Sequence, residues 1–238
     1  MTLADLQLLA AAVLLFVPLE RLLPLHRDQT AARPGLGVDL LHLFASGFLI
    51  RTGATAITVV LSIGAASIVP DEVRELVRGQ PVWAQFIELL LLSDLCFYIA
   101  HRTVHAVPSL WRFHAVHHSS KQLDWLATYR VHPLDQIFNS AVIALPAIAL
   151  GFAPLALLIY AFLYRWHSML LHSNIKIELG LLGWLVATPR FHHWHHANEP
   201  KAFNKNFGGQ LSIWDRLFRS AYDEDSLPTD YGSDGVPE

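Results

Sequence analysis

The histidines of this chain are concentrated in one part of the sequence, at spacings that suit metal binding. Twelve of the 14 histidines lie between residues 101 and 196. Neutral imidazole binds zinc, copper, iron and nickel. One mononuclear site takes three or four protein ligands, so ten clustered imidazoles imply two metal ions. The predicted ligands form four clusters: His101 and His105; His114, His117 and His118; His167 and His172; and His192, His195 and His196.

The spacing within each cluster predicts how its rings are presented. Residues four apart lie on one face of a helix, so His101 and His105 should point the same way. The second and fourth clusters both have the spacing i, i+3, i+4, which also shares a face. The spacing of five between His167 and His172 is looser. One of these two rings must reach around its helix, or the helix must end there.

The rest of the composition favours iron over other metals. The chain has one cysteine, Cys96, which excludes an internal disulfide framework and a cysteine-based zinc or iron–sulfur site. No obvious carboxylate ligand accompanies the histidines. A histidine-rich iron centre beside a membrane suits O2 activation on a lipid chain. Isolated histidines such as His26 and His42 are more often ordinary surface or core residues, and we do not count them as ligands.

Two functions other than O2 activation on a lipid could also use clustered histidines in a membrane protein. A membrane zinc hydrolase would need a glutamate base, as in His-Glu-x-x-His, and the sequence contains no such string. A non-enzymatic metal-binding membrane protein, such as a transporter or sensor, would spread its ligands along a transmembrane path. The ligands here are instead clustered at one side of the predicted helices.

Several polar residues are candidates for orienting the ligands through hydrogen bonds. Asp94 lies seven residues before His101, on the same helix face and inside an apolar run, so we expect it to bind an imidazole. Asp215 and Asn206 are weaker candidates. His132 could contact a ligand or the substrate. His193 should point away from its cluster.

The composition indicates a membrane protein. Hydrophobic residues make up 53% of the chain and charged residues 16%, whereas a soluble domain has about 25% charged residues. The mean hydropathy is +0.35. The net charge of −3 provides no basic field, so nucleic acid is not an expected partner.

Four apolar runs are candidates for membrane helices, because about 20 apolar residues span the core of a bilayer. The first lacks a basic region and a cleavage site, so we interpret it as a retained helix. The second is longer than one span needs, and the sequence leaves open whether it is one helix or two. The runs cover residues 3–23, 38–69, 82–100 and 137–164.

The fourth run must be a helical hairpin if all the histidines meet. His105 follows the third run, and a single straight span after it would carry His167 and His172 to the opposite side of the membrane. Pro146, Gly151 and Pro154 would supply the bend. We therefore predict an all-α integral membrane bundle of about four membrane-embedded helices, with a cytosolic helical cap that holds a histidine-rich dimetal site.

Charge and composition suggest an orientation and a division of the chain. Arginine and lysine residues flank the histidine segments, so the positive-inside rule places the metal site on the cytoplasmic side. We expect N-terminal transmembrane helices over residues 1–93 and a catalytic domain over 94–222. A disordered acidic tail is expected over 223–238.

The motifs resemble those of the fatty acid hydroxylase and sterol desaturase superfamily of membrane di-iron oxygenases. The resemblance runs from about Asp94 to Tyr222, just over half of the chain. It is specific for the superfamily but does not identify the substrate. The strings are His101-Arg-x-x-His105, His114-Ala-Val-His-His-Ser-Ser, Arg130-Val-His-Pro-Leu-Asp, His172-Ser-Asn-Ile, Pro189-Arg-Phe-His-His-Trp-His-His and Asn206-Phe-Gly-Gly followed by Trp214-Asp-Arg-Leu-Phe.

The resemblance implies hydroxylation or desaturation of an unactivated lipid C–H bond with O2, two electrons and two protons. By position it assigns the ten clustered histidines to two non-haem iron ions, with His167 the least secure. It also implies a separate electron-transfer protein, cytochrome b5-like or a ferredoxin with its reductase, which the basic residues Arg112, Lys121 and Lys201 could receive. Residues that could line the lipid site are Trp125, Phe162, Trp166 and Trp194.

Overall fold

The computed structural model of the chain describes residues 2–30 and 32–233, and these are almost entirely helical. Within those ranges five helical stretches are long and apolar enough to cross a membrane, where we predicted about four. The described residues form no β-strand, only isolated bridges. The helices that shape the bundle are α1 (Leu3–Leu22), α2 (Leu36–Leu41), α3 (Gly47–Ile68), α4 (Asp71–Arg78), α5 (Val82–Ala106), α7 (Pro133–Leu150) and α8 (Pro154–His172).

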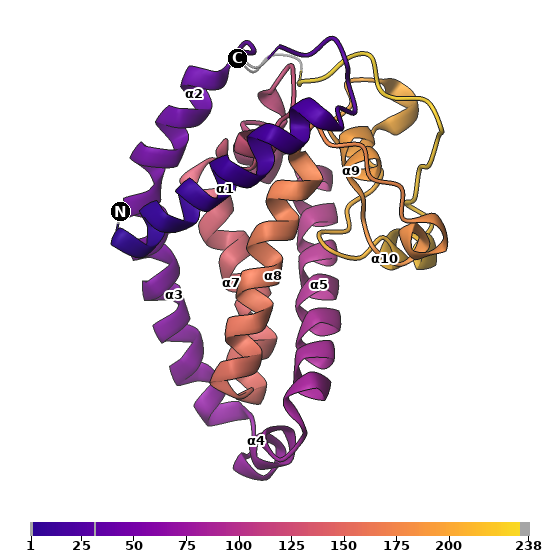
Figure 1. The fold of residues 1–238 in the computed structure, drawn as a ribbon. Coiled ribbons are helices and arrows are strands. Elements are labelled where there is room, and N and C mark those ends of the chain that lie inside the picture. The colour runs from indigo at the N-terminus through magenta and orange to yellow at the C-terminus, as the bar shows by residue number, and fades with distance from the viewer. Residues whose placement is uncertain (1, 31, 234–238) are drawn as a thin grey trace.

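Helices α3, α5, α7 and α8 run alongside one another, and α4 closes the end of the bundle farthest from the histidines (Figure 1). Shorter helices cover the opposite end. They belong to two segments that we call the cap, residues 107–132 and 173–233. The cap contains α6 (Pro108–His114), η2 (His117–Ser119), η3 (Trp125–Tyr129), η4 (Gly180–Trp184), α9 (Pro189–His195), η5 (Pro200–Ala202) and α10 (Ile213–Leu217).

The predicted hairpin is formed by α7 and α8, and its bend at residues 151–153 lies within the predicted interval from Pro146 to Pro154. Pro146 is inside α7 and does not end it. The turn begins at Gly151, whose φ of 67° lies in the left-handed region that glycine adopts without steric cost. Pro154 then occupies the first turn of α8, where its missing N–H costs nothing. The hairpin returns the chain to the side of the bundle that carries His105.

The long second apolar run forms one continuous helix. α2 leads into the π-helical segment η1 (His42–Ser46) and then into α3 without a break. Gly53 lies where α3 meets α7, and a Cβ atom there would collide with the side chain of Ile137. The glycine therefore allows the two helices to approach closely.

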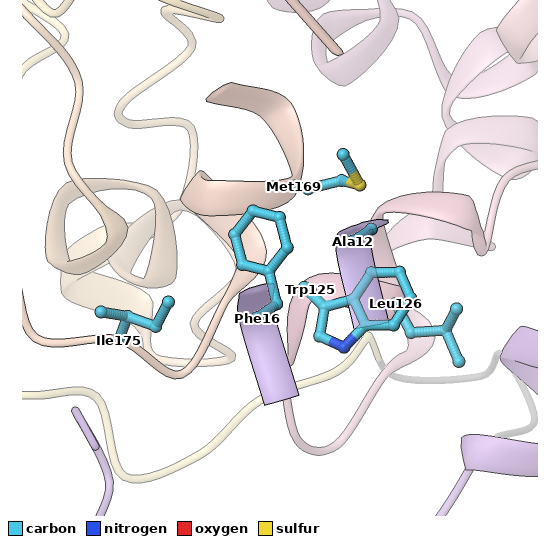
Figure 2. Packing of buried hydrophobic residues seen from close by; sticks show 6 residues of the cluster. All are labelled: Ala12, Phe16, Trp125, Leu126, Met169 and Ile175. Carbon is cyan, nitrogen blue, oxygen red and sulfur yellow. The ribbon is translucent and has the colours of Figure 1, made fainter. Parts of the chain in front are cut away.

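Helix α1 lies obliquely across the bundle instead of parallel to it (Figure 1). Phe16 of α1 stacks on Trp125 of the cap and on Trp166 of α8, with ring centroids 6.0 and 5.9 Å apart. Ala12, Leu126, Met169 and Ile175 complete this buried cluster (Figure 2). The packing joins α1 to the segment that follows His118 and to α8, which ends at His172.

The last described residues pack on the cap. An isolated bridge pairs Ala197 with Tyr231. The Tyr231 hydroxyl lies 2.7 Å from Nε2 of His26 and 2.9 Å from Nδ1 of His193. The segment from 223 to 233, which we expected to be part of a disordered tail, thus contributes a buried side chain to the cap. Residues 234–238 of the expected tail lie outside the described residues.

A buried ionic network joins α2 to the cap. The carboxylate of Asp39 accepts hydrogen bonds from both Arg33 and Arg130. Arg33 also binds Asp124 at 2.6 Å, and Arg130 binds the carbonyl of Gly35 at 2.9 Å. The side chain of Asp39 is fully buried. Each charge in the network is compensated by a partner, which burial requires.

Replacing Asp39 should destabilise the fold, because both arginines would keep a buried charge without their shared partner. We expect Asp39→Asn to lower the free energy of unfolding by about 3–5 kcal/mol. The matched control is Asp71→Asn, since the side chain of Asp71 is 90% exposed and its ion pair with Arg74 is long. Denaturant unfolding of the two variants in detergent measures this difference. Equal stability would show that the network does not hold the cap.

Candidate metal centre

Among the described residues, two groups of histidines are placed to hold metal ions. The ring nitrogens within each group lie within 4.8 Å of one another. Nine of the ten predicted ligands belong to these groups, and His167 belongs to neither. The first group contains His101, His105, His114, His118 and His195, and the second contains His117, His172, His192 and His196.

The two groups draw on the clusters differently from what spacing suggested. His101 and His105 lie on one face of α5, and both join the first group, as predicted. The second cluster does not share one helix, because α6 ends at His114 and a turn precedes the 3-10 segment η2. The second and fourth clusters each contribute to both groups. In both clusters, the i, i+3, i+4 spacing therefore divides the histidines between the two groups.

The donor and acceptor roles of the rings indicate that a cation belongs between them. Nδ1 of His117 lies 3.1 Å from the carbonyl of Arg130, and Nδ1 of His172 lies 2.8 Å from that of Ser168. A carbonyl only accepts, so both Nδ1 atoms carry the proton. The two Nε2 atoms then have lone pairs, yet they face each other at 3.0 Å. Two lone pairs repel at that distance unless a positive ion attracts both.

The first group repeats this arrangement. Nδ1 of His101 donates to the carbonyl of Phe207 at 2.8 Å, and Nδ1 of His114 donates to the carboxylate of Asp135 at 3.1 Å. Their Nε2 atoms face each other at 3.0 Å. Nε2 of His105, His118 and His195 is buried without a hydrogen-bond partner among the described residues. Buried polar atoms are rarely left without one, so these nitrogens fit a bound ion.

The separations also match the size of a transition-metal ion. Nitrogens that each lie about 2.1 Å from one ion, at about 90° to each other, are roughly 3.0 Å apart. Nε2 of His172 is 3.0 Å from Nε2 of His192, which is 3.1 Å from Nε2 of His196. Both groups therefore fit one metal ion each.

The cap histidines are held in the neutral form that binds metal. Burial, reinforced by the nearby His114, lowers the pKa of His117 to about 4. Burial also lowers the pKa of His195 to about 3 and places the pKa of His118 and His196 well below its ordinary value. These rings stay uncharged at neutral pH, so no proton has to be removed before a metal ion binds.

The two carboxylates predicted to support the ligands, Asp94 and Asp215, accept hydrogen bonds from backbone N–H groups of one loop. We expected Asp94 to bind an imidazole, but it accepts the backbone N–H groups of Gln210 at 2.6 Å and Leu211 at 2.9 Å. Asp215 accepts the N–H groups of Phe207 at 2.8 Å and Gly208 at 2.7 Å. Together they fix the loop whose Phe207 carbonyl orients His101.

The glycines of this loop are needed for its close approach to both carboxylates. A Cβ atom on Gly208 would collide with the backbone of Leu211, and one on Gly209 would collide with the ring of Phe97 and crowd Asp94. The Phe-Gly-Gly string is thus explained by contacts that only glycine permits.

Three other predicted residues have supporting positions of different kinds. Asn206 donates to the carbonyls of Phe191 and Tyr222, both at 2.8 Å, and so holds α9 in place. The ring of His132 accepts the N–H of Leu134 and caps α7, without contacting a ligand. His193 turns away from both groups, as predicted, toward Tyr231 and two backbone carbonyls.

The prediction for His167 is revised. Its Nδ1 lies 2.7 Å from the side-chain oxygen of Gln210, and its Nε2 lies 3.0 Å from the carbonyl of Ala187. Five residues of α-helix turn the chain by about 140° beyond one full turn, so His167 and His172 face different sides of α8. His172, at the end of α8, is the member of this pair that joins the second histidine group.

A small cavity of about 70 Å³ adjoins both groups on the side of the bundle, and we call it the metal-side cavity. Asp135 and Asn139 lie in its wall, and Oδ1 of Asn139 has no hydrogen-bond partner among the described residues. Sequence reasoning missed both residues. Asp135 is the last residue of the Arg130-Val-His-Pro-Leu-Asp motif, three residues after His132. Its place in the first turn of α7 could have identified it as a candidate.

Larger pockets also lie near the centre, and two of them contact the cap. The first, which we call the apolar pocket, measures about 430 Å³ between α1, α5 and α8, and shares Tyr164 and Gln210 with the metal-side cavity. Trp166 lines it, as we suggested from the sequence. Trp125 and Trp194 are instead buried in packing clusters and Phe162 is exposed on α8. The second, of about 350 Å³, opens on the cap and reaches His105, His118 and His195 beside Trp111.

Comparison with known proteins gives a consistent result. A family profile described as fatty acid hydroxylase matches residues 86–220, more than half of the chain. The chain is 37% identical over 138 residues to ornithine lipid hydroxylase OlsE of Rhizobium tropici, covering 58% of this chain and 41% of that protein. It is 32% identical over 143 residues to alkylglycerol monooxygenase of Danio rerio, covering 57% and 29%.

Human cholesterol 25-hydroxylase is a further relative, 30% identical over 134 residues, covering 54% of this chain and 47% of that protein. The matched regions span less than half the length of these three relatives. No solved structure matches the chain.

Single substitutions should distinguish histidines that bind a metal ion from histidines that do not. We expect His118→Ala to weaken metal binding in the first group and His172→Ala in the second, each by more than the roughly 10–100-fold loss typical of an outer hydrogen-bond partner. His167→Ala should retain both ions, because it contacts neither group. Metal analysis after dialysis against a chelator gives the count per chain. Loss of an ion from His167→Ala would return that residue to the ligand set.

The metal-free protein should lose stability in acid. The folded-state pKa of His117, about 4, lies below the value of about 6.5 for an unfolded histidine, so the unfolded chain binds protons first. This contribution to stability is complete above about pH 6.5 and is lost as the pH falls toward about 4. Thermal unfolding of chelator-treated protein at several pH values measures it. A melting temperature that stays constant over this range would contradict neutral, buried rings.

Proposed function

Because the chain belongs to the fatty acid hydroxylase family, we propose that it is a membrane oxygenase that hydroxylates a C–H bond of a lipid. We propose further that two iron ions occupy the two histidine groups. One observation carries the proposal: two groups of converging imidazoles adjoin the metal-side cavity, which in turn adjoins the apolar pocket.

The proposed reaction consumes one O2, two electrons and two protons. One oxygen atom enters the C–H bond of the lipid to give an alcohol, and the other leaves as water. When bound, the two iron ions would supply the reduction and activation of O2. The named relatives are hydroxylases or monooxygenases of lipids, which favours hydroxylation over desaturation.

The protein's own residues would hold the metals and shield the reaction. The carbonyls and the Asp135 carboxylate that accept from Nδ1 keep Nε2 of His101, His114 and His117 directed inward. Phe97, Leu171 and Tyr164 in the wall of the metal-side cavity would exclude water from the reacting carbon. Asn139, with its free carbonyl oxygen, is placed to accept a hydrogen bond from a molecule in that cavity.

A zinc hydrolase remains the alternative of a different class, and the site gives it less support. A hydrolase needs a carboxylate or imidazole free to take a proton from water. Asp135 is the carboxylate in the wall of the metal-side cavity, and it already accepts from His114. Among the described residues, the cavity therefore offers no free carboxylate base.

Electrons would reach the centre from the cap. The pocket of about 350 Å³ on the cap, which we call the cap pocket, opens onto His105, His118 and His195. The ring centroids of Trp111 and His105 are 4.8 Å apart. We propose that a separate electron-transfer protein docks over this pocket. We also propose that the cap lies on the cytoplasmic side, since the positive-inside rule favours that side for the basic residues near the ends of the helices.

Oxygen labelling tests the proposed function. Iron-loaded protein in membranes, supplied with a reductase system, should incorporate one atom of ¹⁸O from ¹⁸O2 into a lipid alcohol, as detected by mass spectrometry. His118→Ala should abolish the product, whereas His26→Ala should retain it, because His26 contacts neither metal group. Stoichiometric zinc with no O2-dependent product would instead favour the hydrolase.

A further inference from the structure

Arg165 occupies an unusual position for a charged residue. It lies within α8, one of the membrane-spanning helices, and is half-buried. Within the described part of the chain, its one hydrogen bond, at 3.4 Å, is to the hydroxyl of Tyr129. Among the described residues, no carboxylate lies within ion-pair distance of it. A charged side chain inside a membrane is costly and is ordinarily paired, so an unpaired arginine there indicates a ligand of opposite charge.

Four other arginines that contact the bundle have charged or carbonyl partners. Arg33 and Arg130 bind Asp39 in the buried network. Arg51 of α3 forms an ion pair of 2.6 Å with Asp5 of α1. Arg74 donates to the carbonyl of Ala65 at 2.6 Å. Among the described residues, Arg165 differs from these four in having only a long hydrogen bond, to a neutral hydroxyl.

Arg165 lines a pocket of about 380 Å³ between α1, α3, α8 and the cap, which we call the arginine pocket. Asp5, Arg51 and Arg165 are its charged residues, and two positive charges against one negative leave it with one excess positive charge. The π-helical segment η1 contributes His42 and Leu43 to its wall. π-helical insertions within α-helices are frequent at functional sites, which agrees with a binding role.

The arginine pocket adjoins the metal-side cavity. The two share five residues of their walls, which are Thr128, Val131, Gln136, Tyr164 and Ser168. The apolar pocket shares only Tyr164 and Gln210 with the metal-side cavity, and it lies on the other side of α8. Tyr164 thus borders all three spaces, with a positive charge on one side and apolar walls on the other.

We propose that Arg165 binds the anionic group, a carboxylate or a phosphate, of the lipid substrate. This inference rests on the proposed oxygenase function. The planar guanidinium suits both anions, because it can donate two parallel hydrogen bonds. With the anionic group in the arginine pocket, the carbons next to it enter the metal-side cavity, and the rest of the chain extends past Tyr164 into the apolar pocket. The substrate is then oxidised close to its charged end.

Lipid binding without turnover tests the arginine site. The probes are spin-labelled stearic acid, its methyl ester and spin-labelled phosphatidic acid, added to metal-loaded full-length protein in phosphatidylcholine nanodiscs without an electron donor. Electron paramagnetic resonance measures the immobilised fraction. Wild-type protein should bind the acid, the phosphatidic acid or both roughly tenfold to a hundredfold more tightly than the ester, the range for hydrogen bonds to charged groups.

Variants identify the residue responsible. Arg165→Gln should remove the preference for the anionic probe, and Arg165→Lys should restore part of it. Arg21→Gln is the matched control, because Arg21 is exposed at the end of α1 and lies outside the arginine pocket. Whichever anionic probe loses affinity in Arg165→Gln identifies the group as carboxylate or phosphate. Equal binding of acid, phosphatidic acid and ester by the wild type, or an unchanged preference in Arg165→Gln, would overturn the proposal.

The arginine site and the oxygenase function can fail separately. If the anionic preference depends on Arg165 but no O2-dependent product forms, the site stands and the proposed function fails. If a hydroxylated product forms with the same KM in wild type and Arg165→Gln, the oxygenase stands and the arginine site fails. Mass-spectrometric location of the hydroxyl group at the far end of the chain would also overturn the proposed orientation.

Discussion

The arrangement of this protein depends on an electrostatic contact that is unfavourable by itself. Nε2 atoms of imidazoles whose Nδ1 atoms face oxygen acceptors lie 3.0 Å apart in both histidine groups. They are fixed in that orientation because each Nδ1 proton is taken by an oxygen on the outer side of the ring. Burial lowers the pKa of His117 and His118, so a cation bound between the rings would stabilise the contact. The returning hairpin and the Phe-Gly-Gly loop held by Asp94 and Asp215 can both be understood as ways of bringing these acceptors together.

Much of the site could be predicted from the sequence because its chemistry is local. The pair His101 and His105 obeys helical spacing, and the hairpin follows from the need to return His172 to the same side. Other features depend on tertiary contacts that spacing does not encode. His167 was predicted as a ligand, but the rotation of α8 turns it toward Gln210. Asp94 was expected to bind an imidazole and instead accepts two backbone N–H groups, because the loop lies between it and the ligands.

The overall architecture was predictable to a similar degree. Hydropathy identified the apolar runs, yet it did not indicate that residues 36–65 form one helix or that α1 lies obliquely across the bundle. Both features involve packing between distant segments. Phe16 of α1 stacks on two tryptophans, and Gly53 allows α3 to approach α7 closely. The buried network around Asp39 was also missed, because its members are far apart in the sequence. These contacts place the arginine pocket and the apolar pocket on opposite sides of α8, and both pockets adjoin the metal-side cavity beside the histidine groups.

The central claim is that two metal ions are held by two histidine groups of different size, with five and four rings. Mössbauer spectroscopy of protein loaded with ⁵⁷Fe(II) under anaerobic conditions tests it most directly, because the two environments should differ in quadrupole splitting. The account predicts two iron ions per chain and two components of equal intensity. A single iron ion per chain with one component would contradict it.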